Sequence, residues 1–498
     1  MKRFSGNSDP RIKSLLFTLI LLFLVMPAIQ GKFGLIANQK LSGAFTESEK
    51  PSFKEFTWRS WFEGSFQEVY NKRLEQHIGF RNPLVRINNQ LNYSIFRQAN
   101  AEGVIVGQHN QLFEEDYIKE HFGLFFVGDT IWSKKAIQLK AVQDTLAKLG
   151  KTLVVIFEPG KADFFAEALP AQYRNTPKTI SNYAAFRSDL DKAQVNVLDL
   201  NQYFISIKDK AEYPLFLQTG THWSYYGAAL AADTTLRYLE ALRGIDLPDM
   251  KIIRTEELQE PRYPDNDIGL TMNLLFNLPQ PKTGNPIIRF QHSPAKTKSN
   301  ALIIGDSFYF NWLNNHIPEE AFSSCDFWYY NKNITHSDGS AGGVATALDL
   351  RNEVMKRDII LIMITGRFMH SFAWEFDEQL YDLYYPGYRD PVEFFSNKIR
   401  TYGDEFQRMY KESMAMNISL PDRIQQEARY LFYEDTKKFP DKYTAKRDIL
   451  LSYEMGIRGT AEWMKEIERK ANINKISVDK QIRLDAEWIY NDKFEKNK

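Results

Sequence analysis

Four short runs of nearly continuous apolar residues place the strongest limit on how this chain can fold. They lie at 152–157 (TLVVIF), 195–200 (VNVLDL), 301–305 (ALIIG) and 358–364 (DIILIMI). A strand with one face in water alternates apolar and polar residues, so unbroken runs indicate strands that are buried on both faces. Because helical patterns separate the runs, the sequence predicts an α/β domain in which a parallel sheet lies between layers of helices.

Two helical patterns and one hairpin have recognisable ends. The helix before the first strand is expected to begin at a cap formed by Asp129 or Thr130 and to end at Gly150. A second helix is expected over 224–242, with its first residue, a serine, as the N-cap. The β-branched run and polar turn of 103–115 predict a β-hairpin ahead of both helices.

The N-terminus predicts a membrane segment. The stretch 14–31 contains eighteen uncharged residues, a length near the minimum for a membrane-spanning helix. Positive charge precedes it, at Lys2, Arg3, Arg11 and Lys13, and keeps the start of the chain in the cytoplasm. A cleaved signal peptide has the same basic flank and apolar core, but no clear Ala-x-Ala site follows, so an uncleaved anchor is favoured. Either way, the rest of the chain is expected outside the cytoplasmic membrane of a bacterial cell, in the periplasm or beyond.

We expect four parts along the chain. Residues 1–33 form the signal-anchor or signal peptide, and 34–128 form a polar linker followed by a mainly helical region rich in aromatic residues. The α/β domain occupies 129–385. Beyond it the strand patterns disappear, and 386–498 is expected to be a helical extension without visible chemistry, its last helix capped by Ser477.

Composition excludes several function classes. Acidic and basic residues balance at 63 each, and the sequence has no dense run of Lys and Arg, so nucleic acid is not an expected partner. Aromatic residues reach 14%, which suits a carbohydrate-binding surface, although core and subunit contacts are the commoner use. The single cysteine, Cys325, excludes an internal disulfide. The eight histidines are scattered and no nucleotide-binding loop occurs, so no metal or cofactor is expected; His336 with Asp338 offers only a weak ligand pair.

The run at 301–305 stops on a small nucleophile, because Asp306 and Ser307 follow Gly305 directly. In a sheet of parallel strands, ligands bind at the edge where the carboxyl ends of the strands meet. A serine in the turn between a buried strand and a helix projects its hydroxyl at that edge, and the free N–H groups of the turn can hold an oxyanion. A purely structural turn is the alternative for this tripeptide taken alone.

A serine is a weak nucleophile unless a base lies beside it. His222 is the best candidate, because it lies in the loop QTGTHWSYYG just before a predicted helix, as a residue presented at a sheet edge should. Gly220 precedes it, and Trp223, Tyr225 and Tyr226 follow it, so its surroundings resemble a site. The sequence therefore predicts a Ser307–His222 pair; a structural histidine is the alternative.

Six segments in this order resemble the SGNH-hydrolase-like proteins of the AlgX/AlgJ type, which take part in alginate O-acetylation. The segments are W..WFEGSFQEVYNKRLEQHIGFR, VIVGQHNQLFEE, EPGKADFFAEALP, THWSYYG, GDSF and DIILIMITGRF, and the resemblance covers roughly residues 55–380. It implies a three-layer α/β/α, flavodoxin-like fold with the histidine motif ahead of the serine motif. It also implies transfer of acetyl groups to an exported polysaccharide, with an MBOAT-type membrane acyltransferase supplying the acetyl group.

Carried over residue by residue, the resemblance implies that Ser307 is the nucleophile and His222 the general base. The family's usual histidine motif is Asp-x-His-Trp, and here Gly220 stands in the place of the aspartate. Three explanations remain open. A backbone carbonyl near Thr219 or Gly220 could hold Nδ1–H and leave a Ser–His dyad; a carboxylate from elsewhere could substitute; or catalysis has been lost. The carboxylates considered as substitutes are Asp306, Asp326 and Asp338.

Other polar and aromatic residues are candidates for oxyanion or substrate contacts. They are Gly305, Asp306, Asn311, Asn331, Lys161, Arg367, Trp223 and Tyr226. The N–H of Ser307 is expected in the oxyanion hole, whereas Asn311 and Asn331 are candidates for the asparagine that SGNH enzymes add there. Lys161 and Arg367 follow strand ends and could meet substrate, although a structural ion pair is the alternative for each. Arg81 fits the resemblance as a structural residue.

Two function classes follow. The first is an O-acetyltransferase that works through an acetyl-serine intermediate, or an acetylesterase if water takes the place of the sugar hydroxyl. The second is a membrane-anchored, non-catalytic polysaccharide-binding component of an export or modification complex, which the missing aspartate and the aromatic richness favour. The sequence does not name the polysaccharide.

Overall fold

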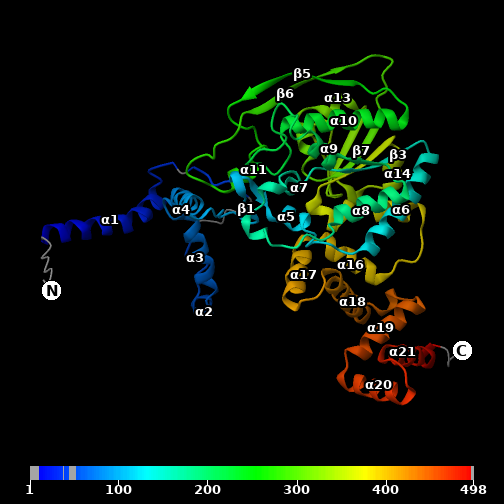
Figure 1. The fold of residues 1–498 in the computed structure, drawn as a ribbon. Helices are drawn as coiled ribbons and strands as arrows, with labels where there is room; N and C mark the ends of the chain where they lie inside the picture. Colours follow the sequence, from blue (N-terminus) through cyan, green and yellow to red (C-terminus); the bar gives the residue numbers. More distant parts are fainter. Residues whose placement is uncertain (1–9, 38, 44–51, 495–498) are drawn as a thin grey trace.

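The centre of the molecule is a seven-stranded sheet with the strand order β10-β9-β8-β7-β11-β3-β4 (Figure 1). The computed structural model describes residues 10–37, 39–43 and 52–494. The strands are β3 (Thr152–Phe157), β4 (Val197–Asp199), β7 (Asn300–Gly305), β8 (Ser324–Tyr329), β9 (Asn333–His336), β10 (Ala341–Val344) and β11 (Ile359–Ile364). All four predicted apolar runs are therefore strands, although the second is shorter than expected.

Five neighbouring strands of this sheet are parallel, from β8 through β7, β11 and β3 to β4. The edge strands β9 and β10 are antiparallel, and the sequence analysis did not anticipate them. Alternate residues of β11 enter two different hydrophobic cores: Ile360 and Ile362 face one, whereas Leu361 and Met363 face the other. Burial on both faces explains the unbroken apolar runs and confirms the predicted three-layer, mostly parallel α/β fold.

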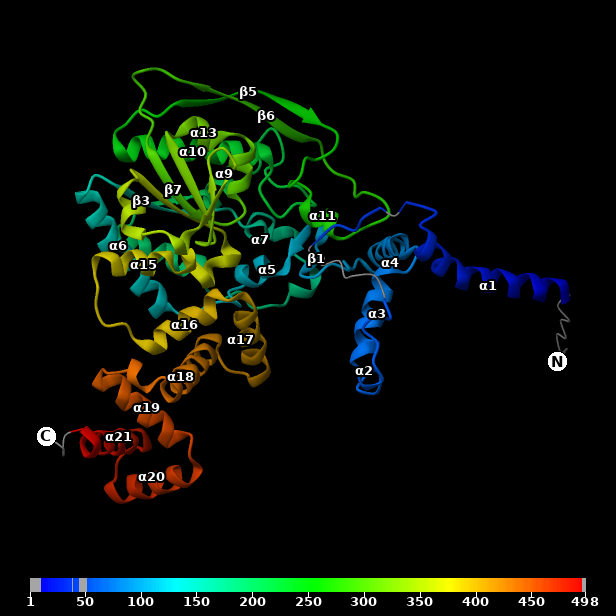
Figure 2. The same cartoon turned by 180° about the vertical axis from the view of Figure 1, so that it is seen from behind.

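Helices cover both faces of the sheet (Figures 1 and 2). One core contains side chains of α6 (Asp129–Lys148), α8 (Asn182–Ala193) and α15 (Phe376–Tyr384). The other contains side chains of α7 (Lys161–Phe164), α9 (Leu200–Ile207), α10 (Tyr225–Arg243), α12 (Tyr309–Asn314) and α13 (Ile317–Ala321). Ser224 caps α10 as expected, because its side chain accepts a hydrogen bond from the N–H of Gly227. The predicted cap of α6 is wrong: Gly128 is the N-cap, and Asp129 is already helical.

A long two-stranded ribbon lies over α10 and is the largest element that the sequence analysis missed (Figure 1). It pairs β5 (Asp249–Leu258) with β6 (Thr283–Gln291) in antiparallel fashion. Most side chains of β5 are at least partly exposed, so the strand lacks the apolar run that marked the central strands. The chain between β5 and β6 leaves the ribbon, forms the short helix α11 (Asp267–Thr271) and returns.

The N-terminal region is helical, as predicted. Helix α1 (Pro10–Phe33) has the length and composition of a membrane span and is almost wholly exposed; Lys2, Arg3 and part of the predicted linker (44–51) lie outside the described residues. Helices α2 (Trp58–Phe62), α3 (Ser65–His77) and α4 (Arg81–Phe96) follow, then the predicted hairpin of β1 (Val104–Val106) and β2 (Leu112–Glu114), and α5 (Glu115–His121). Gly64 adopts a positive φ of 84° between α2 and α3, a conformation that favours glycine.

Among the described residues the chain beyond β11 is helical, as expected. Helix α14 (Leu350–Met355) precedes β11, and α16 (Pro391–Thr401), α17 (Gly403–Met416), α18 (Leu420–Lys438), α19 (Lys446–Arg458), α20 (Ala461–Asn474) and α21 (Val478–Phe494) follow α15. Helices α16 to α18 share the core of the α/β domain, whereas α19 to α21 have a small core of their own. Ser477 accepts a hydrogen bond from the N–H of Lys480 at the start of α21. The four-part division of the chain stays a prediction.

Candidate functional site

Ser307 lies where the sequence predicted, directly after β7 in the turn that leads to α12. The buried Asp306 holds this turn by hydrogen bonds. One carboxylate oxygen accepts a hydrogen bond from the N–H of Phe308, and the other accepts two from Thr365. Thr365 follows β11, the neighbouring strand, so the two strand ends are joined. Asp306 therefore shapes the nucleophile turn, and its own hydrogen bonds do not go to the imidazole.

His222 lies beside this serine. Its Nε2 atom is 2.7 Å from Ser307 Oγ, and its ring is in contact with the ring of Phe308, with centroids 4.9 Å apart. The imidazole comes from the loop before α10, a helix that packs against the sheet next to α12. About 12% of the His222 side chain is exposed, so the pair is shielded but within reach of solvent.

The third member of the group is Asp267, which the sequence analysis did not name. Its Oδ2 atom lies 2.6 Å from His222 Nδ1, and its Oδ1 atom accepts hydrogen bonds of 2.8 Å from the N–H groups of Thr221 and Ile268. The carboxylate is the first residue of α11, in the excursion between β5 and β6. Ser307, His222 and Asp267 thus form one continuous row, with the geometry of a serine-histidine-aspartate triad.

The expected Ser–His dyad therefore needs correction. The carbonyl of Thr219 accepts a hydrogen bond from the N–H of Gly269, and the carbonyl of Gly220 accepts one from Lys161, whereas Nδ1 of His222 faces a carboxylate. The substitute carboxylate is not one of those considered. Asp326 pairs with Arg357 and His336, and Asp338 caps an exposed turn at Ser340.

Gly220 has a steric reason for standing where an aspartate was expected. A Cβ atom at this position would lie 2.2 Å from the backbone oxygen of Asp265, so no side chain fits unless the backbone moves. Gly269 has the same kind of contact, because its Cβ atom would lie 2.6 Å from Cβ of Thr219. The segment that supplies Asp267 therefore packs, backbone against backbone, on the loop that carries His222.

Helix α4 holds that segment from the other side. Asn89 is buried and donates a hydrogen bond of 2.8 Å to the carbonyl of Met272, and Arg86 donates one to the carbonyl of Leu274. Ile268 and Met272 join Tyr93 of α4 in a small hydrophobic core that is separate from the two main ones. The position of Asp267 thus depends on the N-terminal region as well as on the ribbon.

The electrostatics of the site favour a protonated imidazole. Burial by itself lowers the pKa of His222, but the hydrogen bond that His222 donates to Asp267 and the charges of Asp267, Glu114 and Asp306 outweigh it, so the pKa is raised. With Nδ1–H donated to Asp267, Nε2 is free to accept the hydroxyl proton of Ser307. The row can therefore remove a proton from the serine and stabilise the resulting imidazolium.

Comparison with known proteins finds a family model that is similar to part of this site. Residues 104–299 match the family model described as the SGNH hydrolase-like domain of acetyltransferase AlgX. This stretch, less than half of the chain, is similar to that AlgX/AlgJ-type domain. The matched region includes His222 and Asp267 and ends just before the strand that leads to Ser307.

Relatives of this AlgX/AlgJ-type domain share modest sequence identity with it. The probable alginate O-acetylase AlgJ of Pseudomonas putida is 26% identical over 167 residues, which are 32% of this chain and 41% of the relative. The AlgJ of Pseudomonas fluorescens is 23% identical over 243 residues, which are 48% of this chain and 59% of the relative. The chain thus matches less than two thirds of the length of either relative.

Two solved structures are similar to the AlgX/AlgJ-type domain at low identity. The O-acetyltransferase domain of Pseudomonas putida AlgJ superposes with a TM-score of 0.37 and 17% identity, covering 56% of this chain and 99% of that one. Pseudomonas aeruginosa AlgX superposes with a TM-score of 0.38 and 13% identity, covering 57% and 68%. The sequence matches, rather than these distant superpositions, carry the assignment.

The structure places Lys161, a candidate substrate contact, beneath the loop that carries His222. It is almost completely buried, and its Nζ atom donates to the carbonyls of Leu217, Gln218 and Gly220 at 2.6–2.9 Å. These carbonyls belong to the loop that ends at His222. Because an ammonium group has three N–H donors, Lys161 is fully used in holding this loop.

Five other candidates make contacts within the protein. Trp223 donates to the carbonyl of Phe308, and Asn311 donates to the carbonyl of Trp223, so both tie the histidine loop to the nucleophile turn. Asn331 is buried and donates to the carbonyl of Trp374. Tyr226 stacks edge-on against Tyr213, with centroids 5.4 Å apart. Gly305 ends β7, and its carbonyl accepts from the N–H of Tyr330.

Arg367 is the remaining candidate, and it lies at the site. It forms an ion pair with Glu114, whose other contact is the hydroxyl of Thr221, the residue before His222. About a quarter of the side chains of Arg367 and Glu114 is exposed. Both expected alternatives are thus present: the guanidinium is ion-paired, and it also remains accessible at the carboxyl edge of the sheet. Its contact with substrate stays a prediction.

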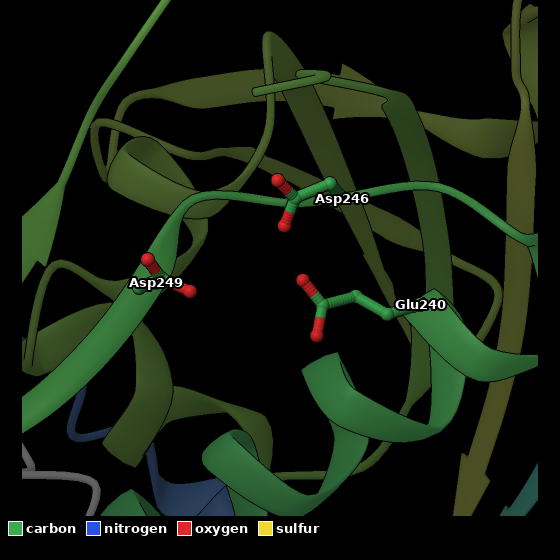
Figure 3. A group of neighbouring side chains, drawn as sticks. All are labelled: Glu240, Asp246 and Asp249. Atoms are coloured by element: carbon green, nitrogen blue, oxygen red, sulfur yellow. The ribbon is translucent and has the colours of Figure 1, made fainter. Parts of the chain in front are cut away.

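One acidic group elsewhere in the domain could suggest a metal. Figure 3 shows that Glu240, Asp246 and Asp249 converge at the end of α10 and the start of β5. Lys296 donates to both aspartates at 2.5 and 2.9 Å, and Glu240 accepts from the N–H of Leu247. A lysine and a backbone amide therefore account for these carboxylates, and we expect no metal there.

Two functional residues of the site escaped the sequence analysis, Asp267 and Glu114. Asp267 lies 45 residues beyond His222 in a polar loop, and no fixed spacing connects a ribbon excursion to a histidine motif. The one available signal was Gly220, because a glycine at the usual aspartate position requires a carboxylate from elsewhere if the triad is kept. Glu114 lies in the predicted hairpin segment, but the sequence does not show that it lies near Arg367 and Thr221 in the fold.

Proposed function

We propose that this protein is an O-acetyltransferase that acts on an exported polysaccharide through an acetyl-serine intermediate. Ser307 is the nucleophile, His222 the general base and Asp267 the residue that orients the imidazole. The row of hydrogen bonds Ser307–His222–Asp267 carries the proposal, because three residues from separate elements meet in the order that nucleophilic catalysis requires. The match to an acetyltransferase family model and the resemblance to alginate O-acetylases supply the substrate class.

The first half of the reaction acetylates the serine. Ser307 Oγ attacks the carbonyl carbon of the acetyl donor while its proton moves to His222 Nε2. The carbonyl oxygen becomes an oxyanion, which the N–H of Ser307 is expected to bind. Collapse of the tetrahedral intermediate breaks the bond to the donor, and the leaving group takes the proton from His222. The negative charge of Asp267 stabilises the imidazolium throughout.

The second half transfers the acetyl group to the sugar. A sugar hydroxyl loses its proton to His222 Nε2 and attacks the acetyl-serine, and the serine oxygen then recovers that proton as it leaves. Water in place of the sugar would make the protein an acetylesterase, so a transferase must hold the sugar in position and limit the access of water. Because the pKa of His222 is raised, the neutral and therefore active base is expected to form at a higher pH than for an unperturbed histidine.

The cellular setting is part of the same proposal. Helix α1 has 24 residues, about 36 Å at 1.5 Å per residue, and its most apolar window is fully exposed with a mean hydropathy of 2.4. We propose that it anchors the main domain at the outer side of a bacterial cytoplasmic membrane, where an MBOAT-type acyltransferase provides the acetyl group. The mass of the mature chain tests the anchor: retention of residues 1–33 supports it, and their loss indicates a signal peptide.

A chromogenic acetyl ester tests the chemistry. The detergent-solubilised full chain is expected to release the chromophore, and Ser307→Ala and His222→Ala are each expected to abolish the release. Ser340→Ala and His316→Ala, which change exposed residues elsewhere, serve as matched controls. Mass spectrometry of a quenched reaction is expected to find one acetyl group on the peptide that contains Ser307.

The formation of acetylated oligosaccharide from an added oligosaccharide acceptor distinguishes the transferase from the esterase. With an uncharged or uronic-acid oligosaccharide present, a transferase moves acetyl from the ester to sugar hydroxyls, whereas an esterase releases only acetate. Failure of Ser307→Ala to lower either activity contradicts the whole mechanism. Absence of turnover with every donor, in a folded protein, favours the non-catalytic binding role instead.

A further inference from the structure

An exposed cluster of aromatic rings surrounds the short helix α2. We call it the aromatic tip; its residues are Phe53, Phe56, Trp58, Trp61, Phe62, Phe66 and Tyr70. The rings contact one another, with centroids 5.0–6.3 Å apart. Phe62, Trp58 and Phe53 are 82%, 70% and 68% exposed. Soluble surfaces rarely show so large an apolar patch unless something covers it.

The tip lies away from the catalytic domain. Figures 1 and 2 show α2 at the free end of α3, which projects from the α3–α4 turn across the direction of α1. The tip is thus separated from the rest of the chain by the length of α3, whose 13 residues span about 20 Å.

The base of α3 is fixed to the end of α1. The N–H of Gly79, in the α3–α4 turn, donates a hydrogen bond of 3.0 Å to the carbonyl of Pro27. A Cβ atom at Gly79 would lie 2.4 Å from that carbonyl oxygen, and one at Gly31 would lie 2.9 Å from the carbonyl oxygen of His77. The two backbones therefore touch directly, and the angle between α1 and α3 is set by this contact.

We propose that the aromatic tip is a second membrane contact, inserted into the interfacial layer of the bilayer that α1 spans. This inference rests on the anchoring role of α1 given under the proposed function. If α1 stands across the bilayer, α3 runs along its surface and carries the tip to a point about 20 Å from the span. Trp and Tyr side chains concentrate at that depth because their rings are apolar at one end and polar at the other.

The charges around the tip suit a lipid surface. Arg59 pairs with Glu63 at 2.8 Å, and Arg73 pairs with Glu55 at 3.2 Å, so opposite charges at its rim are matched within the region itself. The exposed aromatic rings are therefore the main feature of the tip that a binding partner would contact. A span together with an interfacial contact restricts rotation of the body about the axis of α1, which a single helix leaves free.

Site-specific fluorescence tests the proposal in the full chain. Cys325 is the only cysteine and is buried, so a cysteine introduced on the surface can be labelled selectively. An environment-sensitive dye on Phe62→Cys or Trp58→Cys is compared with the same dye on Lys192→Cys, an exposed position on α8. Each variant is reconstituted in vesicles of phosphatidylethanolamine and phosphatidylglycerol. Nitroxide-bearing lipid is expected to quench the tip labels several-fold more than the Lys192 label, and aqueous iodide the reverse.

Equal quenching of tip and control labels by iodide overturns the proposal. So does a tip label that neither quencher reaches, because that result indicates a protein contact, such as a second copy of the chain. Flotation of the vesicles after an alkaline wash reports insertion of α1 separately, and its failure removes both the anchor and this inference. Hydrolysis of the chromogenic ester by the same vesicles reports the catalytic proposal, which the tip variants are expected to leave unchanged.

Discussion

Ser307 and Asp267 stand at opposite ends of one hydrogen-bonded row, yet different parts of the molecule place them. The serine ends a central strand, and its turn is fixed by a buried aspartate and by the adjoining strand. The aspartate lies on an excursion from a peripheral ribbon and is held by α4 and by close backbone contacts. The central sheet thus positions Ser307, whereas the ribbon excursion and α4 position Asp267.

The comparison has a chemical consequence. A residue fixed by the sheet moves only if the core deforms, while a residue fixed by loops can shift through local changes. The nucleophile half should therefore respond to mutation only at the site itself. The carboxylate half should respond also to changes in the ribbon excursion and in the N-terminal helices. The following experiments test this difference, from the largest expected effect to the smallest.

Asp267→Asn removes the charge from the end of the row and should produce the largest effect. The amide can present the wrong hydrogen-bonding group to Nδ1, and the imidazolium loses its counter-charge, so kcat should fall by about 10³- to 10⁴-fold. The measurement is steady-state hydrolysis of the chromogenic ester, with circular dichroism to verify the fold. A fall of less than about tenfold would mean that the serine and histidine work as a dyad.

Gly220→Asp introduces the aspartate that the family's histidine motif usually has. We expect this aspartate to destabilise the protein and not to replace Asp267. The new Cβ atom would collide with the backbone oxygen of Asp265, so the excursion must move, at a cost of about 1–3 kcal/mol in the free energy of unfolding. Gly387→Asp is the matched control, because a Cβ atom there meets nothing within 4 Å. Urea unfolding measures the cost. If Gly220→Asp combined with Asp267→Asn regains full activity, the two carboxylate positions are interchangeable and the steric argument is wrong.

Asn89→Ala breaks the hydrogen bond from α4 to the segment that carries Asp267. It leaves the buried carbonyl of Met272 unpaired, at a cost of about 1–3 kcal/mol, and we expect kcat to fall by about tenfold while KM changes little. Asn88→Ala, on the exposed side of the same helix, is the control. The pH at which activity appears should also move downward, because a displaced Asp267 raises the pKa of His222 less. An unchanged pH profile would show that Asn89 supports only stability.

Glu114→Gln should give the smallest effect. The charge of Glu114 helps to raise the pKa of His222, so its removal lowers that pKa and brings the neutral base in at a lower pH. The acid limb of the kcat/KM profile is expected to shift down by a fraction of a pH unit, with a plateau within about twofold of the original. Glu319→Gln, an exposed change outside the site, is the control. A shift toward higher pH would contradict the assigned sign.

Much of the fold and half of the site could be predicted from the sequence. The central strands can be recognised in the sequence because strands buried on both faces have few polar residues, as at 152–157 and 358–364. Ser307 and His222 could be proposed as a pair because one follows such a strand and the other precedes a helix at the same edge of the sheet, although a structural turn and a structural histidine were the alternatives. The outer strands β5 and β6 could not be recognised, since their partly exposed faces leave no clean pattern.

Asp267 and Lys161 show why the rest could not be predicted. The position of Asp267 results from tertiary contacts among the ribbon, α4 and the histidine loop, and none of these leaves a local signature in its own neighbourhood. Lys161 has the sequence context of a substrate contact, directly after a strand end, but the loop before His222 folds over it and occupies all its donors. The position of a residue directly after a strand predicts that it lies at the carboxyl edge of the sheet. It does not predict whether a loop then covers its side chain.

The link between α4 and the excursion has a practical consequence for work on soluble fragments. The short stretch that follows the apolar helix also holds the excursion. The backbone N–H and carbonyl of Ser42 form two hydrogen bonds with the side-chain amide of Asn273, and the carbonyl of Lys40 accepts one from Arg86. A fragment trimmed beyond residue 43 to gain solubility discards these ties. Poor turnover by such a fragment would then reflect a less firmly held Asp267. A fragment that begins before residue 39 is the better starting point for assays in the absence of lipid.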